Sequence, residues 1–359
     1  MIQVSIRKRL SRQFCLETEF QSADRCLGIL GASGCGKSMT LKCIAGIEIP
    51  DEGYIAVNGR VLFDSARKIN LKPQARRVGY LFQHYALFPR MRVLENLTAA
   101  LSLPKQEALQ KARPWIARFG LTDLEYRYPA QLSGGQQQRT ALARMLIQEP
   151  ELILLDEPFS ALDTHLREQM QLQLLQLLES RDDVIMVTHS RDEAYRLCDE
   201  LLVMDTGRVL TKGGTKALFQ DPGSVPVARI TGCKNISPIR RTGERELYAL
   251  DWGLSLRVSV PIEDAITHVG IRAHDFEPVW EAADPKPGAY NQIRMAITQR
   301  SEEPFEQALL FTNAEAQSPA EQGELWWKYS KYRFTDIPPR LAIPPTALLL
   351  LRSASTSQA

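Results

Sequence analysis

Side chains that handle phosphates gather near residue 35, where glycines are followed by a lysine and a hydroxyl. The run fits the pattern G-x-x-x-x-G-K-[ST] and comprises Gly31, Ala32, Ser33, Gly34, Cys35, Gly36, Lys37 and Ser38. It lies between an apolar strand pattern and a helical pattern, where glycines can turn backbone N–H groups toward phosphate oxygens. Lys37 would then reach the terminal phosphates of a nucleotide, and the Ser38 hydroxyl would bind Mg²⁺. The spacing therefore predicts a nucleoside triphosphate site.

Two carboxylates end a second apolar run further along the chain. Leu152–Leu155 is typical of a buried strand, and Asp156 and Glu157 follow it directly. A carboxylate at the C-terminal edge of a parallel sheet lies beside the phosphate loop. We therefore expect Asp156 to hold Mg²⁺, directly or through water, and Glu157 to act as general base on the attacking water. The simpler alternative is a solvated acidic turn.

A second helix start of the anion-binding type follows Leu132. It comprises Ser133, Gly134, Gly135 and Gln136. The chain thus has two phosphate-binding helix starts but one lysine for the γ-phosphate. Two chains facing each other would solve this, with each ATP between the phosphate loop of one copy and the serine–glycine turn of the other. A plain serine N-cap is the alternative for this pentapeptide taken alone.

The elements that must position these residues alternate between short apolar runs and helical patterns over residues 1 to about 230. This alternation predicts an α/β fold. The expected strands are Cys26–Leu30, Val78–Phe82, Leu152–Leu155, Val184–Thr188 and Leu201–Met204, and the expected helices are Lys37–Ala45, Gly134–Ile147, His165–Glu179 and Arg191–Cys198. After an expected linker at 221–226, short strand-like runs alternate with Pro and Gly turns. Residues from about 235 to 355 should therefore form a separate, mainly β domain.

Together these motifs resemble the ABC transporter ATPases among the P-loop NTPases. They stand in the family's order: the phosphate loop, Gln83 after a strand, the serine–glycine signature, the acidic pair, Ser160–Asp163 and His189. The resemblance implies a helical subdomain at about 84–148. It implies that Gln83 touches Mg²⁺ and senses the γ-phosphate, and that Asp163 lies across a dimer interface. His189 would contact the γ-phosphate and fix the attacking water.

Two positions near the nucleotide leave alternatives open. The family places an aromatic residue in the N-terminal segment to stack on adenine, and Phe14 is the best-placed ring there. Phe20 stands further on, and the guanidinium plane of Arg12 could also stack. Phe14 could equally belong to a strand core. Cys35 is expected to be a small residue filling a tight loop, and a thiol activated by Lys37 is the alternative.

Further segments resemble the importer branch of the family, which has extra C-terminal domains. Residues 83–89 and 93–96 resemble the importer branch. In the family the segment after Gln83, whose aromatic residues Tyr85 and Phe88 we expect to be exposed, forms part of a groove that receives a short cytoplasmic helix of the permease. Val269–Arg272 resembles the oligonucleotide-fold-like (TOBE or molybdate-binding-like) regulatory domain, and Thr231–Ile236 resembles the junction of molybdate and sulfate importer ATPases. The implied function is ATP hydrolysis that powers import of an oxyanion, with molybdate first and sulfate or thiosulfate second. Polyamine, iron and sugar remain alternatives.

Net charge, apolar runs and cysteine spacing indicate where the protein works and which partners it can have. Net charge is +2 and no apolar run approaches the ~18–20 residues that span a bilayer. The six cysteines form no C-x-x-C pair or zinc spacing, which favours reduced cytosolic thiols. We expect a peripheral protein at the cytoplasmic face of the plasma membrane. Its partners would be a second copy, two transmembrane permease subunits and, indirectly, an external solute-binding protein, with no nucleic acid. The rivals are a non-transport ABC ATPase acting on DNA or ribosomes and an oxyanion-binding regulator with a vestigial ATPase.

Overall fold

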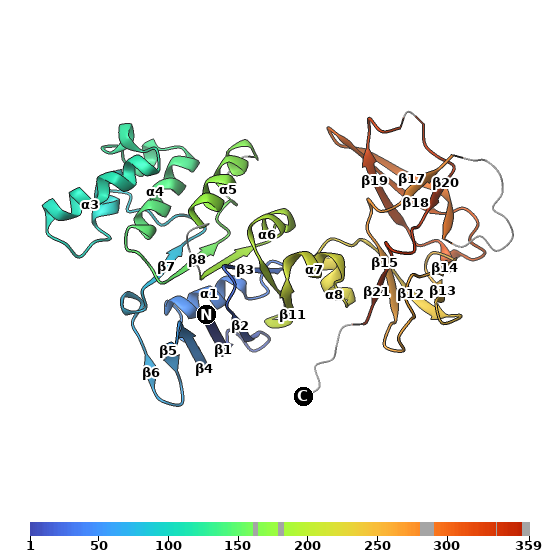
Figure 1. Ribbon diagram of the computed structural model, residues 1–359, viewed down its shortest axis with the longest axis horizontal. Coiled ribbons are helices and arrows are strands. Elements are labelled where there is room, and N and C mark those ends of the chain that lie inside the picture. Colours follow the sequence, from blue (N-terminus) through green and yellow to red (C-terminus); the bar gives the residue numbers. More distant parts are fainter. Residues whose placement is uncertain (161–163, 179–182, 281–290, 335, 354–359) are drawn as a thin grey trace. The chain divides into compact units, whose positions relative to one another are not determined.

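The structure is a computed structural model that describes residues 1–160, 164–178, 183–280, 291–334 and 336–353 (Figure 1). The chain divides into two compact units, Met1–Lys216 and Ala217–Ala359. This division falls upstream of the boundary expected near residue 230. The reason is the short helix α8 (Val225–Ile230), in which Val225 and Ala228 form one buried cluster with Cys233 and Leu351 of the second unit. The expected linker at 221–226 therefore runs into a packed helix.

An eleven-stranded sheet forms the centre of the first unit (Figure 1). Its order is β6-β5-β4-β1-β2-β11-β10-β3-β9-β8-β7. The strands are β1 (Ile2–Arg9), β2 (Cys15–Ser22), β3 (Cys26–Gly31), β4 (Glu52–Val57), β5 (Arg60–Asp64), β6 (Ile69–Asn70), β7 (Val78–Leu81), β8 (Leu152–Asp156), β9 (Val184–Thr188), β10 (Glu200–Asp205) and β11 (Arg208–Gly214). The run from β10 to β7 is parallel, so the carboxyl ends of these strands meet at one edge. The five strands expected from the sequence all lie in this run.

The antiparallel part of the sheet was not expected. β1 and β2 pair antiparallel, and β1 also pairs antiparallel with β4. Side chains along β1 alternate between buried and exposed, because Ile2, Val4 and Ile6 are buried while Ser5 and Arg7 are exposed. This half of the sheet brings the hairpin at 10–14 next to the phosphate loop.

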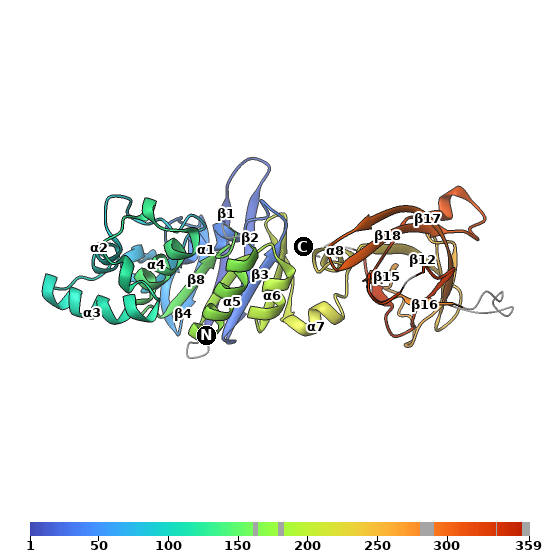
Figure 2. The ribbon, with the colours of Figure 1, turned by 90° about the horizontal axis from the view of Figure 1, so that it is seen from above.

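Helices cover both faces of the parallel strands. The first unit contains α1 (Lys37–Ala45), α2 (Val93–Thr98), α3 (Lys105–Arg118), α4 (Gly134–Leu146), α5 (Thr164–Leu178) and α6 (Arg191–Leu197). Of these, α2 and α3 pack on each other and on α4. Along β8, Leu152 and Leu154 join the core that contains Leu41 of α1, while Ile153 and Leu155 join the core that contains Leu142 of α4. Figure 2 shows α5 and α6, which contact each other, lying along the sheet. The acidic pair thus lies at the end of a strand that is buried on both faces, with Asp156 as its last residue.

The second unit is mainly β, as expected. After α7 (Thr215–Gln220) and α8, it contains two five-stranded sheets, β14-β13-β12-β15-β21 and β16-β20-β17-β18-β19. The strands are β12 (Asn235–Arg241), β13 (Glu246–Ala249), β14 (Leu254–Arg257), β15 (His268–Ile271), β16 (Glu277–Val279), β17 (Gln292–Glu302), β18 (Glu306–Asn313), β19 (Leu325–Ser330), β20 (Arg340–Ala342) and β21 (Leu349–Leu351). Trp252, Phe311 and Trp327 lie in one buried core. Asn235 ties the first sheet to the second by two hydrogen bonds to the Trp326 backbone, at 2.7 and 2.8 Å.

Candidate nucleotide and metal site

The glycine-rich loop lies between β3 and α1, as the motif requires. Gly36 precedes the helix with a φ of 106°, in the left-handed region that favours glycine. A Cβ on Gly36 would stand 2.8 Å from Leu16, and a Cβ on Gly31 would stand 2.2 Å from the carbonyl oxygen of Met204. Both positions therefore need glycine, for conformation in one case and for close packing in the other. The first turn of α1 is left open to an anion.

Lys37 is held inside this loop. Its side chain is buried, and Nζ donates hydrogen bonds to the carbonyl oxygens of Gly31 at 2.9 Å and Ala32 at 2.8 Å. Within the described part of the chain, no carboxylate pairs with this ammonium. A buried cation that is held by two neutral carbonyls and the Cys35 sulfur favours an anionic ligand, so the position suits phosphate.

Asp156 ends β8 with both carboxylate oxygens engaged. Ser38 Oγ donates to Oδ1 at 2.7 Å, and the Tyr80 hydroxyl donates to Oδ2 at 2.8 Å. Burial and the Asp156 charge raise the pKa of Tyr80, so its hydroxyl stays protonated. The Ser38 hydroxyl, the Asp156 carboxylate and the Gln83 amide are oxygen donors of the kind that Mg²⁺ prefers. Mg²⁺ is also commonly held by one or two carboxylates together with substrate phosphates. The residues present therefore fit this ion.

Glu157 contacts two further side chains that the sequence predicted for the site, Gln83 and His189. Gln83 Nε2 lies 3.2 Å from Glu157 Oε2, and His189 Nδ1 lies 3.4 Å from Glu157 Oε1. The Glu157 backbone has a φ of 47°, uncommon for a residue with a side chain, and its N–H donates to Val187 of β9. This backbone turn directs the Glu157 carboxylate to Gln83 and His189, while the Asp156 carboxylate meets Ser38. The sheet edge thus brings together the phosphate loop, which begins at Gly31, with Gln83, Glu157 and His189.

The serine–glycine turn starts α4 with a capping box. The Gln136 N–H donates to Ser133 Oγ at 3.4 Å, and the Ser133 N–H donates to Gln136 Oε1 at 2.9 Å. Ser133 and Gly134 are exposed, while Gly135 is buried. Behind them, the buried Gln138 donates to the carbonyl oxygen of Pro158 at 2.9 Å. The signature helix is thereby tied to the loop that follows Glu157.

The structure bears differently on three further residues that the sequence placed near the nucleotide: Phe14, Cys35 and Asp163. Phe14 is half-buried against the core and lies 3.6 Å from the place of a Cβ on Gly36, so its ring borders the phosphate loop. Cys35 is buried, and burial raises the pKa of its thiol despite the nearby Lys37, which contradicts the activated-thiol alternative. Asp163 lies outside the described residues.

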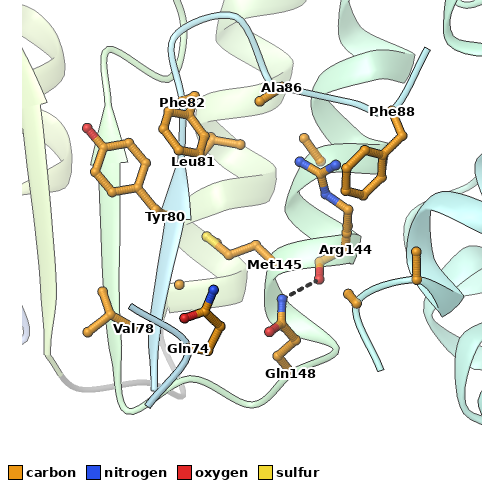
Figure 3. Close-up of a pocket in the computed structure, with 14 residues that line it drawn as sticks. Gln74, Val78, Tyr80, Leu81, Phe82, Ala86, Phe88, Arg144, Met145 and Gln148 are labelled. Carbon is orange, nitrogen blue, oxygen red and sulfur yellow. Dashed lines mark hydrogen bonds between the residues drawn. The ribbon is translucent and has the colours of Figure 1, made fainter. Parts of the chain in front are cut away.

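A groove opens beside β7, at the edge of the sheet (Figure 3). It measures about 520 Å³ and is lined by β7, Ala86, Phe88 and residues of α4. The Phe88 ring is 45% exposed, and the Arg144 guanidinium lies 5.1 Å from its centre. The interpretation of Tyr85 as an exposed aromatic residue is wrong, because its side chain is buried and does not line the groove. The φ of 58° at Tyr85 turns the chain so that this ring points inward.

Comparisons with known proteins agree with this geometry. A sequence profile described as ABC transporter matches residues 20–160. A sulfate/thiosulfate import ATP-binding protein of Chromobacterium violaceum is 40% identical over 261 residues, which cover 71% of this chain and 69% of that protein. This chain belongs to the family of ABC transporter ATP-binding proteins. The expected family, its α/β fold and its assignment to the ATPases are thereby confirmed.

Other ABC relatives match over shorter lengths. A molybdenum import ATP-binding protein of Paramagnetospirillum magneticum is 38% identical, and an Fe(3+) ions import ATP-binding protein of Haemophilus influenzae is 42% identical. These alignments cover 63% and 59% of this chain, and the chain spans 63% and 61% of those two relatives. A dimeric ATP-binding cassette solved in a post-hydrolysis state with ADP and Pi is 26% identical, with a TM-score of 0.51. That match covers 60% of this chain and 99% of the cassette.

The ABC fold also contains contacts that sequence reasoning missed. Tyr80 and Gln138 bond to the acidic strand end and to its following loop. Thr188 Oγ1 donates to Glu193 at 2.5 Å and accepts from the Ser190 N–H, which fixes the backbone on both sides of His189. The signal in the sequence that could have revealed these contacts was a polar side chain inside an otherwise apolar, buried element, because such a group needs a hydrogen-bond partner.

Among the described residues, no helix is long and apolar enough to cross a bilayer.

Proposed function

We propose that this protein is the ATP-hydrolysing subunit of an importer and that it powers a separate membrane permease. The observation that carries the proposal is the contact of Glu157 with both Gln83 and His189, beside the loop that holds Lys37. A carboxylate fixed by an amide and an imidazole suits a general base, and the neighbouring lysine suits the phosphates of its substrate.

In this mechanism Gln83 has two tasks and each of the other residues has one. Lys37 and the phosphate-loop N–H groups bind the terminal phosphates of ATP. Ser38, Asp156 and Gln83 would hold Mg²⁺, which neutralises charge on the phosphates when it is bound. Glu157 accepts a proton from the water that attacks the γ-phosphorus, while the bond to the ADP oxygen breaks. His189 and Gln83 keep the Glu157 carboxylate oriented.

A second copy completes the site. Ser133 and Gly134 are exposed at the start of α4, where they can meet a phosphate bound by another chain. The solved cassette that resembles this chain is a dimer bound to ADP and Pi, which supports this arrangement. Closure around ATP and reopening after loss of the γ-phosphate would then drive the permease.

The groove beside β7 supports a docking role for the membrane partner. Its lining includes Val78–Phe82 just before Gln83 and Ala86 and Phe88 just after it. It also combines an exposed ring with the cation of Arg144. A short permease helix seated there would sense the state of Gln83. The protein would thus work at the cytoplasmic face of the membrane through its partners, with an external solute-binding protein delivering the solute.

For the solute we propose an oxyanion, either sulfate or thiosulfate or molybdate. The relative named for sulfate and thiosulfate aligns over 261 residues, more than the first unit contains, so its similarity reaches the second unit. The relatives named for Fe(3+) and for spermidine or putrescine align over 216 and 214 residues, which the first unit alone can contain. This difference favours the oxyanion class.

The test is uptake by vesicles that contain this protein and the membrane proteins that co-purify with it. ATP-dependent uptake of sulfate, thiosulfate or molybdate is the expected result, and the Glu157→Gln variant should abolish it. Uptake of Fe(3+) or spermidine in place of these anions would overturn the oxyanion class. Absence of ATP turnover by the wild-type complex would overturn the function itself.

A further inference from the structure

We propose that Tyr80 is a positioning residue of the Mg²⁺ site, because its hydroxyl orients the Asp156 carboxylate toward Ser38. The proposal rests on the proposed ATPase function and adds a residue that the motifs do not include. Tyr80 OH lies 2.8 Å from Asp156 Oδ2, while Ser38 Oγ lies 2.7 Å from Asp156 Oδ1. The two hydroxyls therefore hold the carboxylate from opposite oxygens.

The sheet places Tyr80 where this contact is possible. β7 and β8 run parallel, and Tyr80 is paired in register with Leu154, two residues before Asp156. Its ring lies 4.3 Å from that of Phe82 and packs against the core under α1. Figure 3 shows the phenol pointing away from Arg144 and Met145 in the groove. The hydroxyl therefore lies on the nucleotide side of β7, while other atoms of Tyr80 line the groove.

The environment of Asp156 makes this hydroxyl important. The carboxylate is only 6% exposed, and within the described residues its hydrogen-bond partners are two neutral hydroxyls, with no lysine or arginine paired to it. Mg²⁺ demands near-octahedral geometry, so its affinity depends on the plane of each oxygen ligand. With one donor on each oxygen that plane is fixed before the ion arrives. Removing a partner of this kind commonly weakens metal affinity about 10–100-fold.

Tyr85 provides a matched control. It is a second buried tyrosine five residues along the chain, and its hydroxyl has no hydrogen-bond partner among the described residues. Tyr80→Phe and Tyr85→Phe each remove one buried hydroxyl and keep the ring. They differ in that the hydroxyl of Tyr80 alone contacts Asp156. A purely structural role for these tyrosines would therefore give similar results for both variants.

The experiment measures metal binding apart from turnover. The purified full chain is loaded with a non-hydrolysable ATP analogue, and Mn²⁺ is titrated while its paramagnetic signal reports the free ion. Tyr80→Phe should raise the Mn²⁺ dissociation constant about tenfold or more. The Mg²⁺ concentration for half-maximal ATP turnover should rise in parallel. Affinity for a fluorescent ATP analogue in EDTA should stay at the wild-type value, and Tyr85→Phe should match wild type throughout.

A double-mutant cycle with Asp156→Asn separates positioning from general damage. In that background Tyr80→Phe should add little to the loss of Mn²⁺ affinity, since its partner is already altered. Equal Mn²⁺ affinity for wild type and Tyr80→Phe would overturn the proposal, as would an equal loss of nucleotide affinity in EDTA. Failure of the wild-type protein to hydrolyse Mg-ATP would instead overturn the proposed function, which keeps the two outcomes apart.

Discussion

Replacing Glu157 by glutamine removes a base but keeps the shape of the side chain. In the wild-type protein Gln83 Nε2 lies 3.2 Å from the Glu157 carboxylate. The amide of the variant still offers an oxygen to Gln83 Nε2 and remains beside His189. The backbone φ of 47° is equally available to glutamine. None of the contacts of Lys37 or Ser38 involves Glu157. Binding of ATP should therefore persist while the proton transfer is lost.

The size of the effect follows from the role assigned to this carboxylate. A positioned general base contributes about 10²–10⁴-fold to a rate, which corresponds to roughly 2.7–5.4 kcal/mol of barrier. We expect the Glu157→Gln variant to lose activity in this range. Its affinity for ATP should be unchanged, because no phosphate contact is removed.

Single-turnover hydrolysis of radiolabelled ATP, with protein in excess, measures the chemical step directly. Asp192→Asn is a matched control, because it makes the same acid-to-amide change on an exposed residue in the first turn of α6. That control should hydrolyse ATP at the wild-type rate. A Glu157→Gln rate within tenfold of wild type would refute the assignment of Glu157 as the base.

Three further predictions concern the loop and its support. Lys37→Ala should weaken ATP binding at least tenfold by equilibrium titration, because the cation proposed to bind the terminal phosphates is lost, whereas Lys42→Ala in the last turn of α1 should not. Arg76→Ala should lower the free energy of unfolding in urea by about 3 kcal/mol or more, since it leaves the Ile44 carbonyl without its donor and the Cys43 carbonyl with the Gly46 N–H alone. Burial raises the pKa of Cys43 to about 12, so its unfolded thiol ionises first. Stability should then fall between pH 9 and 12 by up to ~1.4 kcal/mol per pH unit, a slope that Cys43→Ala should reduce in urea titrations.

The central strands and α1 could be predicted because their local patterns are strong. Val184–Thr188 and Lys37–Ala45 match the expected bounds, and each combines an apolar pattern with a motif at its end. β1 was missed because its alternating apolar pattern is short and is followed by the charged run that begins at Arg7. The boundary between the units fell elsewhere because α8 packs on Leu351, a contact between residues more than a hundred positions apart. No local pattern encodes such a contact.

In the candidate site too, local patterns predicted some residues, while others depend on contacts between distant parts of the chain. Spacing alone was enough to nominate Lys37, Asp156 and Glu157, because strand ends of a parallel sheet meet at one edge. The contact of Tyr80 with Asp156 joins residues 76 positions apart and depends on the pairing of β7 with β8. Tyr85 was expected at the surface because a turn segment is commonly exposed, yet its positive φ turns the ring into the core. Long-range pairing and local backbone twist were the missing information.

The most direct test of the shared ATP site is a structure of the Glu157→Gln variant with Mg-ATP, determined by electron cryomicroscopy or crystallography. Two copies should face each other, with Ser133 Oγ of one copy about 3 Å from the γ-phosphate of the nucleotide that Lys37 of the other copy binds. A nucleotide bound by Lys37 with Ser133 of every copy remote from its phosphates would contradict the shared site.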